Sequence, residues 1–255
     1  MKAVITSAGK GSRMKYMTSI MPKALLPLFD KEDDGKLVVR PLFDMITESL
    51  STAGADDVCI VIGGAGNLLT SYTAGRSFTF VVQTEPKGFG DAVLRAENFV
   101  GNDPFFVHAD DGVLSGGYRE AAALYEQNEP DGILLVRRVS NPSRYGIVLA
   151  EERGKFMGHQ LLHVTDAEEK PKMPKSDMAI SAVYLFRPKI MKALKSAKVS
   201  GPEKELTGGI QKIISEGGEI MALRLDDEKW LNVGDPDSYH KALEYTFASS
   251  AAPTR

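Results

Sequence analysis

Short apolar runs alternate with helical patterns along the first 140 residues. The segment 41–53 is typical, because its apolar residues Leu42, Ile46 and Leu50 recur at helical spacing and Gly54 follows as a stop signal. Further helices are predicted over 90–99 and 118–127, and strands over 3–6, 58–62, 78–82, 104–108 and 132–136, the second and third of them buried. This alternation predicts an α/β fold with a mostly parallel central sheet and helices on both faces.

The pattern changes from about Tyr145, where strand-like runs have less helix between them. Strands are predicted over 146–150, 161–165, 180–186 and 219–225, and helices over 204–216 and 235–247. We interpret this half as a smaller mixed β elaboration on the same core. No linker interrupts residues 1–248, so we expect a single domain followed by a flexible tail over 249–255. The polar stretch 31–36 is expected to be a solvated loop.

Composition narrows the classes of protein to consider. The formal net charge of −3 argues against a nucleic-acid binder, which usually has a basic balance. The single cysteine, Cys59, excludes an internal disulfide and fits a reducing cytoplasm. No apolar run approaches the roughly 20 residues of a membrane span. We therefore expect a cytoplasmic protein with no membrane and no nucleic-acid partner.

The loop after the first predicted strand is the most informative stretch. Gly9 and Gly11 follow the apolar run directly, and the cations Arg13 and Lys23 come soon after. Glycines let backbone N–H groups approach phosphate oxygens, and fixed cations suit a polyphosphate. The string matches neither a Walker A loop nor a Rossmann fingerprint. An ordinary βα turn with two surface cations is the structural alternative.

Three further segments place polar groups after predicted strands. Gln83, followed by Gly88, can donate to and accept from the imide of a pyrimidine, or it can be incidental to a turn. Asp110 ends a strand, where a carboxylate can hold Mg²⁺ or cap a turn. Asp235 stands before Pro236 in the pattern of a helix N-cap, a role that can coexist with metal binding.

Two segments of the second half are ambiguous by themselves. Glu169 and Lys170 stand before Pro171 in a charged triplet, which is typical of solvated surface. The Tyr145-Gly146 pair begins a strand and can face a sugar or simply pack. His159 and His163 are flanked by β-like residues, which argues against a metal pair on a helix.

Together these motifs resemble the sugar-1-phosphate nucleotidylyltransferases. G-x-G-S-R-M and P-K, Q-x-E-P-x-G-x-G-x-A, an acidic strand end, R-Y-G-I-V, E-K-P and V-G-D-P occur in the family's order from about Lys2 to Leu243. The resemblance is strongest to the bacterial and archaeal UTP–glucose-1-phosphate uridylyltransferases, with the thymidylyltransferases next. The sequence departs from the family at Ala109, where glycine is common, and over 31–39, which looks like an added loop.

The resemblance implies a Rossmann-like core, with a nucleotide-binding part over 1–140 and a sugar-phosphate-binding part over 141–248. It implies a role for each matching residue. The catalytic residues would be Arg13, Lys23 and Asp110; the nucleotide-binding residues Ala8, Gly9, Gly11, Gln83 and Gly88; the sugar-phosphate-binding residues Gly146, Glu169 and Lys170; and the Mg²⁺ ligands Asp110 and Asp235. Small-molecule substrates are the expected partners, with a homo-oligomer as a further expectation from the family.

The reaction implied by the resemblance is attack of a sugar 1-phosphate on the α-phosphorus of UTP, or next dTTP, with glucose 1-phosphate favoured as the sugar. Two other functions stay open. A nucleotide-sugar-dependent glycosyltransferase can share such a core, although Arg13 and Lys23 suit a pyrophosphate leaving group that it does not expel. A non-catalytic nucleotide-sugar-binding regulatory protein would need the same pocket without turnover.

Overall fold

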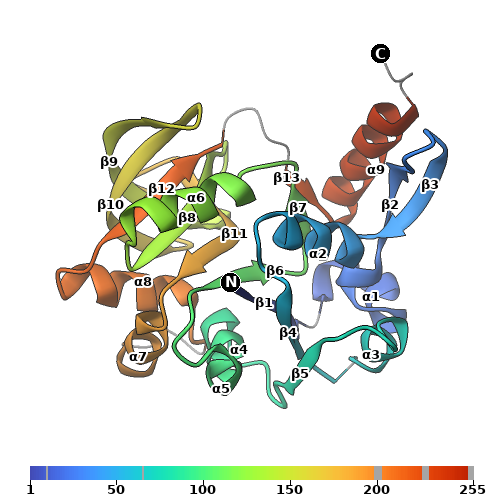
Figure 1. The fold of residues 1–255 in the computed structure, drawn as a ribbon, viewed down its shortest axis with the longest axis horizontal. Coiled ribbons are helices and arrows are strands. Elements are labelled where there is room, and N and C mark those ends of the chain that lie inside the picture. The colour runs from blue at the N-terminus through green and yellow to red at the C-terminus, as the bar shows by residue number, and fades with distance from the viewer. Residues whose placement is uncertain (10, 65, 198–202, 226–229, 252–255) are drawn as a thin grey trace.

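The centre of the molecule is one long sheet (Figure 1). The computed structural model describes residues 1–9, 11–64, 66–197, 203–225 and 230–251. Within these residues the sheet has nine strands, in the order β5 (Thr79–Val82), β4 (Asp57–Ile62), β1 (Lys2–Ser7), β6 (Phe105–Ala109), β11 (Met178–Phe186), β8 (Gly132–Arg138), β12 (Ile220–Arg224), β10 (His159–Glu169) and β9 (Gly146–Phe156).

The N-terminal half of this sheet is parallel and buried on both faces. Val4 of β1 lies opposite Cys59 of β4 and Val107 of β6, all in parallel register. Side chains alternate across a strand, so Ala3 and Ile5 enter the core on one face and Val4 enters the core on the other. Burial on both faces explains why these strands read as continuous apolar runs.

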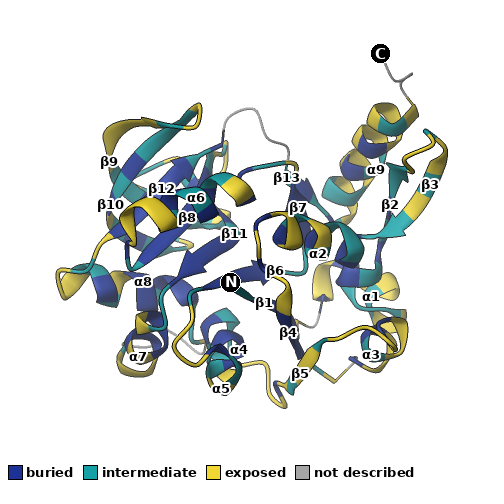
Figure 2. Ribbon diagram, viewed as in Figure 1, coloured by how far each residue is buried: buried dark blue, intermediate teal, exposed yellow. Residues whose placement is uncertain are grey.

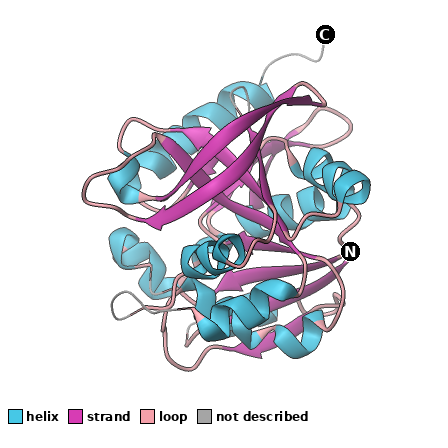
Figure 3. Cartoon of the chain, turned by 90° about the vertical axis from the view of Figure 1, so that its left-hand side faces the viewer, coloured by secondary structure: helices cyan, strands magenta, loops and turns pink. Residues whose placement is uncertain are grey.

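Helices cover both faces (Figures 2 and 3). One core contains buried residues of α2 (Leu42–Thr52) and α6 (Tyr118–Asn128). The other contains buried residues of α4 (Phe89–Arg95), α5 (Glu97–Val100), α7 (Lys189–Ser196) and α8 (Leu206–Ser215). Two short helices, α1 (Tyr16–Ile20) and α3 (Asn67–Tyr72), and the C-terminal α9 (Pro236–Ala251) complete the described helices.

The predicted fold class is confirmed, and the C-terminal half is a mixed elaboration of the same sheet. Strand β11 runs antiparallel to β6 and β8, β8 and β12 are parallel, and β10 is antiparallel to β12 and β9. Two small sheets flank it, one of β7 (Gly112–Leu114) with β13 (Trp230–Asn232) and one of β2 (Pro27–Lys31) with β3 (Leu37–Pro41).

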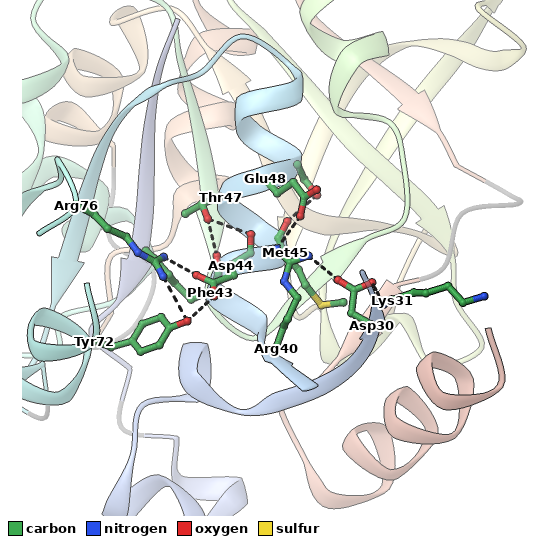
Figure 4. Close-up of polar contacts among 11 residues, drawn as sticks. Asp30, Lys31, Arg40, Phe43, Asp44, Met45, Thr47, Glu48, Tyr72 and Arg76 are labelled. Carbon is green, nitrogen blue, oxygen red and sulfur yellow. Dashed lines mark hydrogen bonds and ion pairs between the residues drawn. The ribbon is translucent and has the colours of Figure 1, made fainter. Parts of the chain in front are cut away.

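The segment interpreted as an added loop is instead a β-hairpin, and its turn holds Gly35 at φ +85°. The guanidinium of Arg40 on β3 fastens this hairpin to α2, pairing with Asp30 Oδ2 at 2.6 Å and Glu48 Oε2 at 2.8 Å (Figure 4). The same helix carries Asp44, which bonds Arg76 and Tyr72 beside α3. Polar pairs therefore hold the hairpin against α2.

Other expectations need smaller corrections. The strand predicted over 78–82 is β5, an exposed edge strand rather than a buried one, because no strand pairs with its outer side in the described sheet. The helix predicted over 90–99 is divided at Ala96 into α4 and α5, and α7 was not predicted. The tail begins later than expected, since α9 extends to Ala251; residues 252–255 lie outside the described residues. None of the described helices has the length and apolar character needed to cross a bilayer.

Candidate active site

The loops after β1 and β6 leave the same edge of the sheet. Thr6 lies opposite Ala109 in the parallel register, and the Asp110 N–H donates to the Thr6 carbonyl over 3.2 Å. Because the carboxyl ends of neighbouring parallel strands meet at one edge, the loop that follows β1 and the carboxylates of Asp110 and Asp111 share it.

A cavity opens at this edge, and we call it the loop cavity. Seven of the predicted site residues line it: Ala8, Gly9, Gly11, Gln83, Gly88, Asp110 and Lys170. Its wall continues through Thr6, Ser12, Pro86, Phe89, Ala92, Ala109, Asp111, Glu203 and Glu205. The residues predicted to bind a nucleotide, which come from two separate segments, thus lie around one space together with Asp110.

The Asp110 carboxylate at the loop cavity is fixed by a hydrogen bond. Its Oδ2 accepts a hydrogen bond from the Ser7 hydroxyl at 2.6 Å. Burial raises its pKa to about 6, assisted by the neighbouring Asp111 and opposed by the Lys23 charge and by hydrogen bonds from Ser7 and the Ala24 backbone. Lys23 begins a short 3₁₀ turn, Lys23–Leu25, and does not line the cavity in the described structure.

Gln83 presents a hydrogen-bond acceptor, and not a donor, to the loop cavity. Its side chain is buried, and its amide NH₂ donates to the Gly88 carbonyl at 3.2 Å and to Asp91 Oδ2 at 2.8 Å. Both amide hydrogens therefore have partners, which leaves the carbonyl oxygen of Gln83 as the group for a ligand. That oxygen can accept from an N–H donor.

Gly88 lies where the loop after β5 packs against the chain before α8. Its φ is +106°, and a Cβ built there would lie 2.5 Å from the Lys204 carbonyl oxygen. Lys204 in turn donates its N–H to the Lys87 carbonyl and accepts from the Gly90 N–H. Only glycine fits this position without displacing the chain before α8.

A second cavity, which we call the strand cavity, begins where the loop cavity ends. Four predicted residues line it: Arg13, Gly146, Glu169 and Lys170. It shares Phe89, Ala109, Asp111, Lys170 and Glu205 with the loop cavity. The two cavities are therefore neighbouring parts of one site, and ligands in them would meet at this common wall.

Glu169 and Lys170 are ordered by contacts at the end of β10. Glu169 Oε1 pairs with the Lys170 ammonium at 3.0 Å, and its Oε2 accepts from the Thr207 hydroxyl at 3.1 Å. Lys170 has φ +41°, and its N–H donates to the Tyr145 carbonyl. A Cβ on Gly146 would lie 3.1 Å from Glu169 Oε2, so glycine makes room for this carboxylate. Glu169 and Lys170 therefore line the candidate site, whereas Glu168 of the same triplet pairs with Lys175 at 2.9 Å outside both cavities.

Glu205 lies at the wall between the cavities and was not predicted. Burial raises its pKa to about 7, with further contributions from the negative charges of Glu169 and Glu203 and an opposing one from Lys170. It stands immediately before α8, which begins at Leu206. The sequence shows it only as one of two acids between 203 and 205.

Asp235 adopts the N-cap role, since its Oδ1 accepts the Ser238 N–H at 3.0 Å. Its Oδ2 lies 3.9 Å from Arg13 and 3.7 Å from Arg144. Burial alone would raise its pKa, but the Ser238 bonds and both arginines outweigh that effect and lower it. Asp235 lines neither cavity, whereas Asn232 lines the strand cavity. The geometry thus favours a role in holding the two arginines.

A buried pair, His108 and Tyr118, lies behind Asp110. His108 is fully buried, and its Nδ1–H donates to the Ala109 carbonyl at 2.6 Å while its Nε2 accepts from the Tyr118 hydroxyl at 2.8 Å. The carbonyl can only accept, so the proton is on Nδ1. The Leu114 N–H then donates to the Tyr118 oxygen. His108 is a satisfied core histidine, as its position on an apolar strand suggests.

Comparison with known proteins places the chain among nucleotidyl transferases. A family model described as nucleotidyl transferase matches residues 2–248. A glucose-1-phosphate thymidylyltransferase of Streptomyces antibioticus is 29% identical over 92% of this chain, and the chain spans 63% of that protein's length. The UTP–glucose-1-phosphate uridylyltransferase AglF of Haloferax volcanii is 27% identical over 95% of both chains.

Solved structures agree on the fold. A UDP-glucose pyrophosphorylase complexed with UDP-glucose superposes with a TM-score of 0.83 at 24% identity, covering 97% of this chain and 98% of the other. The family resemblance that we inferred from the motifs is confirmed, while the relatives include both uridylyl- and thymidylyltransferases.

Proposed function

Because this chain belongs to the nucleotidyl transferase family, we propose that it joins a nucleoside triphosphate to a sugar 1-phosphate. An oxygen of the sugar's phosphate attacks the α-phosphorus in line, a new P–O bond forms, and the bond to the β-phosphate breaks. The products are an NDP-sugar and pyrophosphate. UTP and glucose 1-phosphate are the favoured pair, with dTTP as the next nucleotide.

The observation that carries this proposal is the common wall of the loop cavity and the strand cavity. A nucleotide in the first and a sugar phosphate in the second would bring their phosphates together beside Asp111 and Lys170. The acceptor phosphate is already ionised, so no protein nucleophile is required. Catalysis is then positioning together with stabilisation of charge.

The cations divide between the two substrates. Lys23 stands near Asp110 on the nucleotide side, and Arg13 lines the neighbouring strand cavity. We assign both to the negative charge that builds on the departing pyrophosphate, with Arg13 reaching it from the strand cavity. Backbone around Gly9 and Gly11 approaches the triphosphate without interference from a Cβ. Lys170 binds the sugar's phosphate, and Glu169 accepts hydrogen bonds from the sugar's hydroxyls.

The donor set at the acidic strand end fits Mg²⁺. Within the described residues no three His, Cys, Asp or Glu side chains form a ready-made metal cage. Mg²⁺ commonly takes one or two carboxylates and completes its shell with substrate phosphates. Asp110 and Asp111 offer such a pair, and burial raises the pKa of Asp110 to about 6, which a cation bound at this carboxylate would lower. Asn232 lines the strand cavity and offers a neutral oxygen as a further ligand. We prefer it to Asp235 as a ligand of the ion, because Asp235 pairs with two arginines. Bound there, the ion would offset the mutual repulsion of the two phosphates.

The base is recognised by Gln83. Uracil and thymine both have an N3–H donor, which matches the free carbonyl oxygen of the Gln83 amide. Cytosine has an acceptor at N3, so it would leave that oxygen unpaired. This argument selects UTP and dTTP over CTP, and it does not separate the first two.

A screen of pyrophosphate release tests the proposal. Purified protein is given each of four nucleoside triphosphates with glucose 1-phosphate and Mg²⁺, and pyrophosphate is measured with a coupled assay. We expect release with UTP and with dTTP, and little with CTP. Transfer of sugar from UDP-glucose without pyrophosphate chemistry would support the glycosyltransferase, and tight UTP binding without turnover of any sugar phosphate would support the regulatory protein.

A further inference from the structure

Two residues that line the strand cavity have buried polar atoms without hydrogen-bond partners. Among the described residues, the unsatisfied buried side-chain atoms include Arg137 Nε and Ser181 Oγ, and both residues line this cavity. The Ser181 residue is only 2% exposed. Buried polar groups in native proteins nearly always have a partner, and leaving one unpaired costs free energy. A ligand in the cavity that these side chains turn to meet would supply the missing partners.

The strands bring the two residues to the same place. Arg137 lies opposite Ala179 in the antiparallel β8–β11 pair, and Ser181 is two residues further along β11. Such diagonal neighbours are within reach of a long side chain. The Arg137 guanidinium also stacks over the Tyr145 ring at 5.4 Å, which orients it at the cavity wall.

The backbone of β11 is distorted where Ser181 faces the cavity. The register with β8 slips between Ile180 and Tyr184, and Ala182 has φ +54°. A left-handed backbone is unfavourable for a residue with a Cβ. The slip leaves three successive residues, Ile180, Ser181 and Ala182, lining the cavity, which a regular alternating strand cannot do. Strain of this kind is typical of binding sites.

Arg137 differs from the other arginines of the cavity. Arg13 and Arg144 share the carboxylate of Asp235. Arg137 has no carboxylate within ion-pair distance in the described part of the chain, and it does not line the loop cavity. Since the reacting phosphate must reach the common wall, and Arg137 is not among the residues of that wall, we place Arg137 beside the part of the sugar away from that phosphate.

We propose that Arg137 and Ser181 form a subsite for an oxyanion carried by the sugar, and that the preferred acceptor is a hexuronic acid 1-phosphate. A guanidinium binds a carboxylate through two parallel hydrogen bonds, and the Ser181 hydroxyl donates to the same group. A phosphate on the sugar's far end has the same chemistry, so a sugar bisphosphate is tested beside the uronate. The inference rests on the proposed function, because the sugar phosphate must enter the strand cavity.

The test compares substrates first in the wild-type protein. Values of kcat/KM are measured with UTP and three acceptors: glucose 1-phosphate, glucuronic acid 1-phosphate and glucose 1,6-bisphosphate. We expect the uronate to exceed glucose 1-phosphate by about ten-fold or more, the scale of a charge-assisted pair. A higher kcat/KM for the bisphosphate than for the uronate would assign the subsite to phosphate and would overturn the proposal of a uronic acid. Equal or better use of glucose 1-phosphate would overturn the inference and leave the proposed function standing, whereas no pyrophosphate from any acceptor would overturn both.

Variants then assign the preference to these residues. Arg137→Gln should reduce the ratio of uronate to glucose kcat/KM by about ten-fold or more, and Ser181→Ala, a small change that keeps the fold, should reduce it several-fold. Arg138→Gln is the matched control, because the side chain of Arg138, next in sequence to Arg137, is 63% exposed and pairs with Asp177 at the surface. An equal loss with both acceptors in Arg137→Gln would mean that Arg137 binds the 1-phosphate, which contradicts the proposal, as would an unchanged ratio in both variants.

Discussion

The loop cavity and the strand cavity are built in different ways. The first is formed mostly by backbone and small residues at the carboxyl ends of parallel strands, where Gly88 and the loop after β1 allow close approach. The second is formed by side chains of a mixed sheet, several of which are paired with opposite charges, such as Glu169 with Lys170. We infer that the loop cavity is sensitive to changes of backbone and of Asp110, and that the choice of sugar phosphate is set in the strand cavity.

The largest effect is expected from Asp110→Asn on the loop-cavity side. The variant keeps the size of the side chain but removes the charge that would gather Mg²⁺ and the phosphates. We expect turnover to fall by about 10²-fold or more, as when a preorganised stabilising group is lost. Steady-state kinetics over a range of Mg²⁺ concentrations measures this. Asp103→Asn is the control, since that exposed carboxylate pairs with Lys2 away from both cavities. Near-normal turnover in Asp110→Asn would remove Asp110 from the proposed chemistry.

Next in size is Gly88→Ala, which tests the backbone character of the loop cavity. The new Cβ would have both an unfavourable φ and a 2.5 Å approach to the Lys204 carbonyl. We expect unfolding free energy to decrease by about 2 kcal/mol, with a raised KM for the nucleotide. Gly75→Ala separates the two causes, because Gly75 has φ +85° but nothing within 4 Å of its Cβ position. If both variants lose the same stability in urea, close packing at Gly88 is unimportant.

The same contrast decides what could be predicted from the sequence. In the loop cavity, Gly9 and Asp110 follow buried strands directly, so the apolar runs before them were enough to bring them together. Residues of the strand cavity depend on how antiparallel strands pair. Ser181 reaches the cavity only because β11 slips its register at an alanine with positive φ, and no alternating pattern indicates that slip. The predicted cap at Asp235 is confirmed, and its role as a metal ligand stays a prediction; its ion pairs with Arg13 and Arg144 could not be foreseen, because the two arginines come from distant segments.

A smaller effect is expected behind the loop cavity, from Tyr118→Phe. Loss of the hydroxyl leaves His108 Nε2 and the Leu114 N–H without their partner in the core. We expect a loss of about 1.5 kcal/mol in unfolding free energy, typical of unpaired buried groups. Tyr125→Phe on the same helix is the control, since that ring is only partly buried. Equal stability of Tyr118→Phe and wild type in thermal melts would show that the hydrogen bonds of the Tyr118 hydroxyl contribute nothing to the stability of the core behind Asp110.

The smallest effect concerns Glu205, at the wall that both cavities share. Its pKa in the folded protein, about 7, lies above its ordinary value of 4.5 because of burial and of Glu169 and Glu203, although Lys170 opposes them. Between these two pH values the folded protein holds a proton that the unfolded chain has lost, so stability falls as pH rises through this window. Glu205→Gln removes the titration, so its unfolding free energy should match that of wild type at pH 4.5 but exceed it at pH 8 by less than about 1 kcal/mol, given partial solvent screening.

Glu216→Gln is the control and should move stability in the opposite direction, because a hydrogen bond from Lys212 lowers the pKa of Glu216. Urea denaturation of all three proteins at both pH values makes the comparison, and a Glu205→Gln variant that is less stable than wild type at pH 8 would mean that the Glu205 carboxylate is well compensated by cations at this wall.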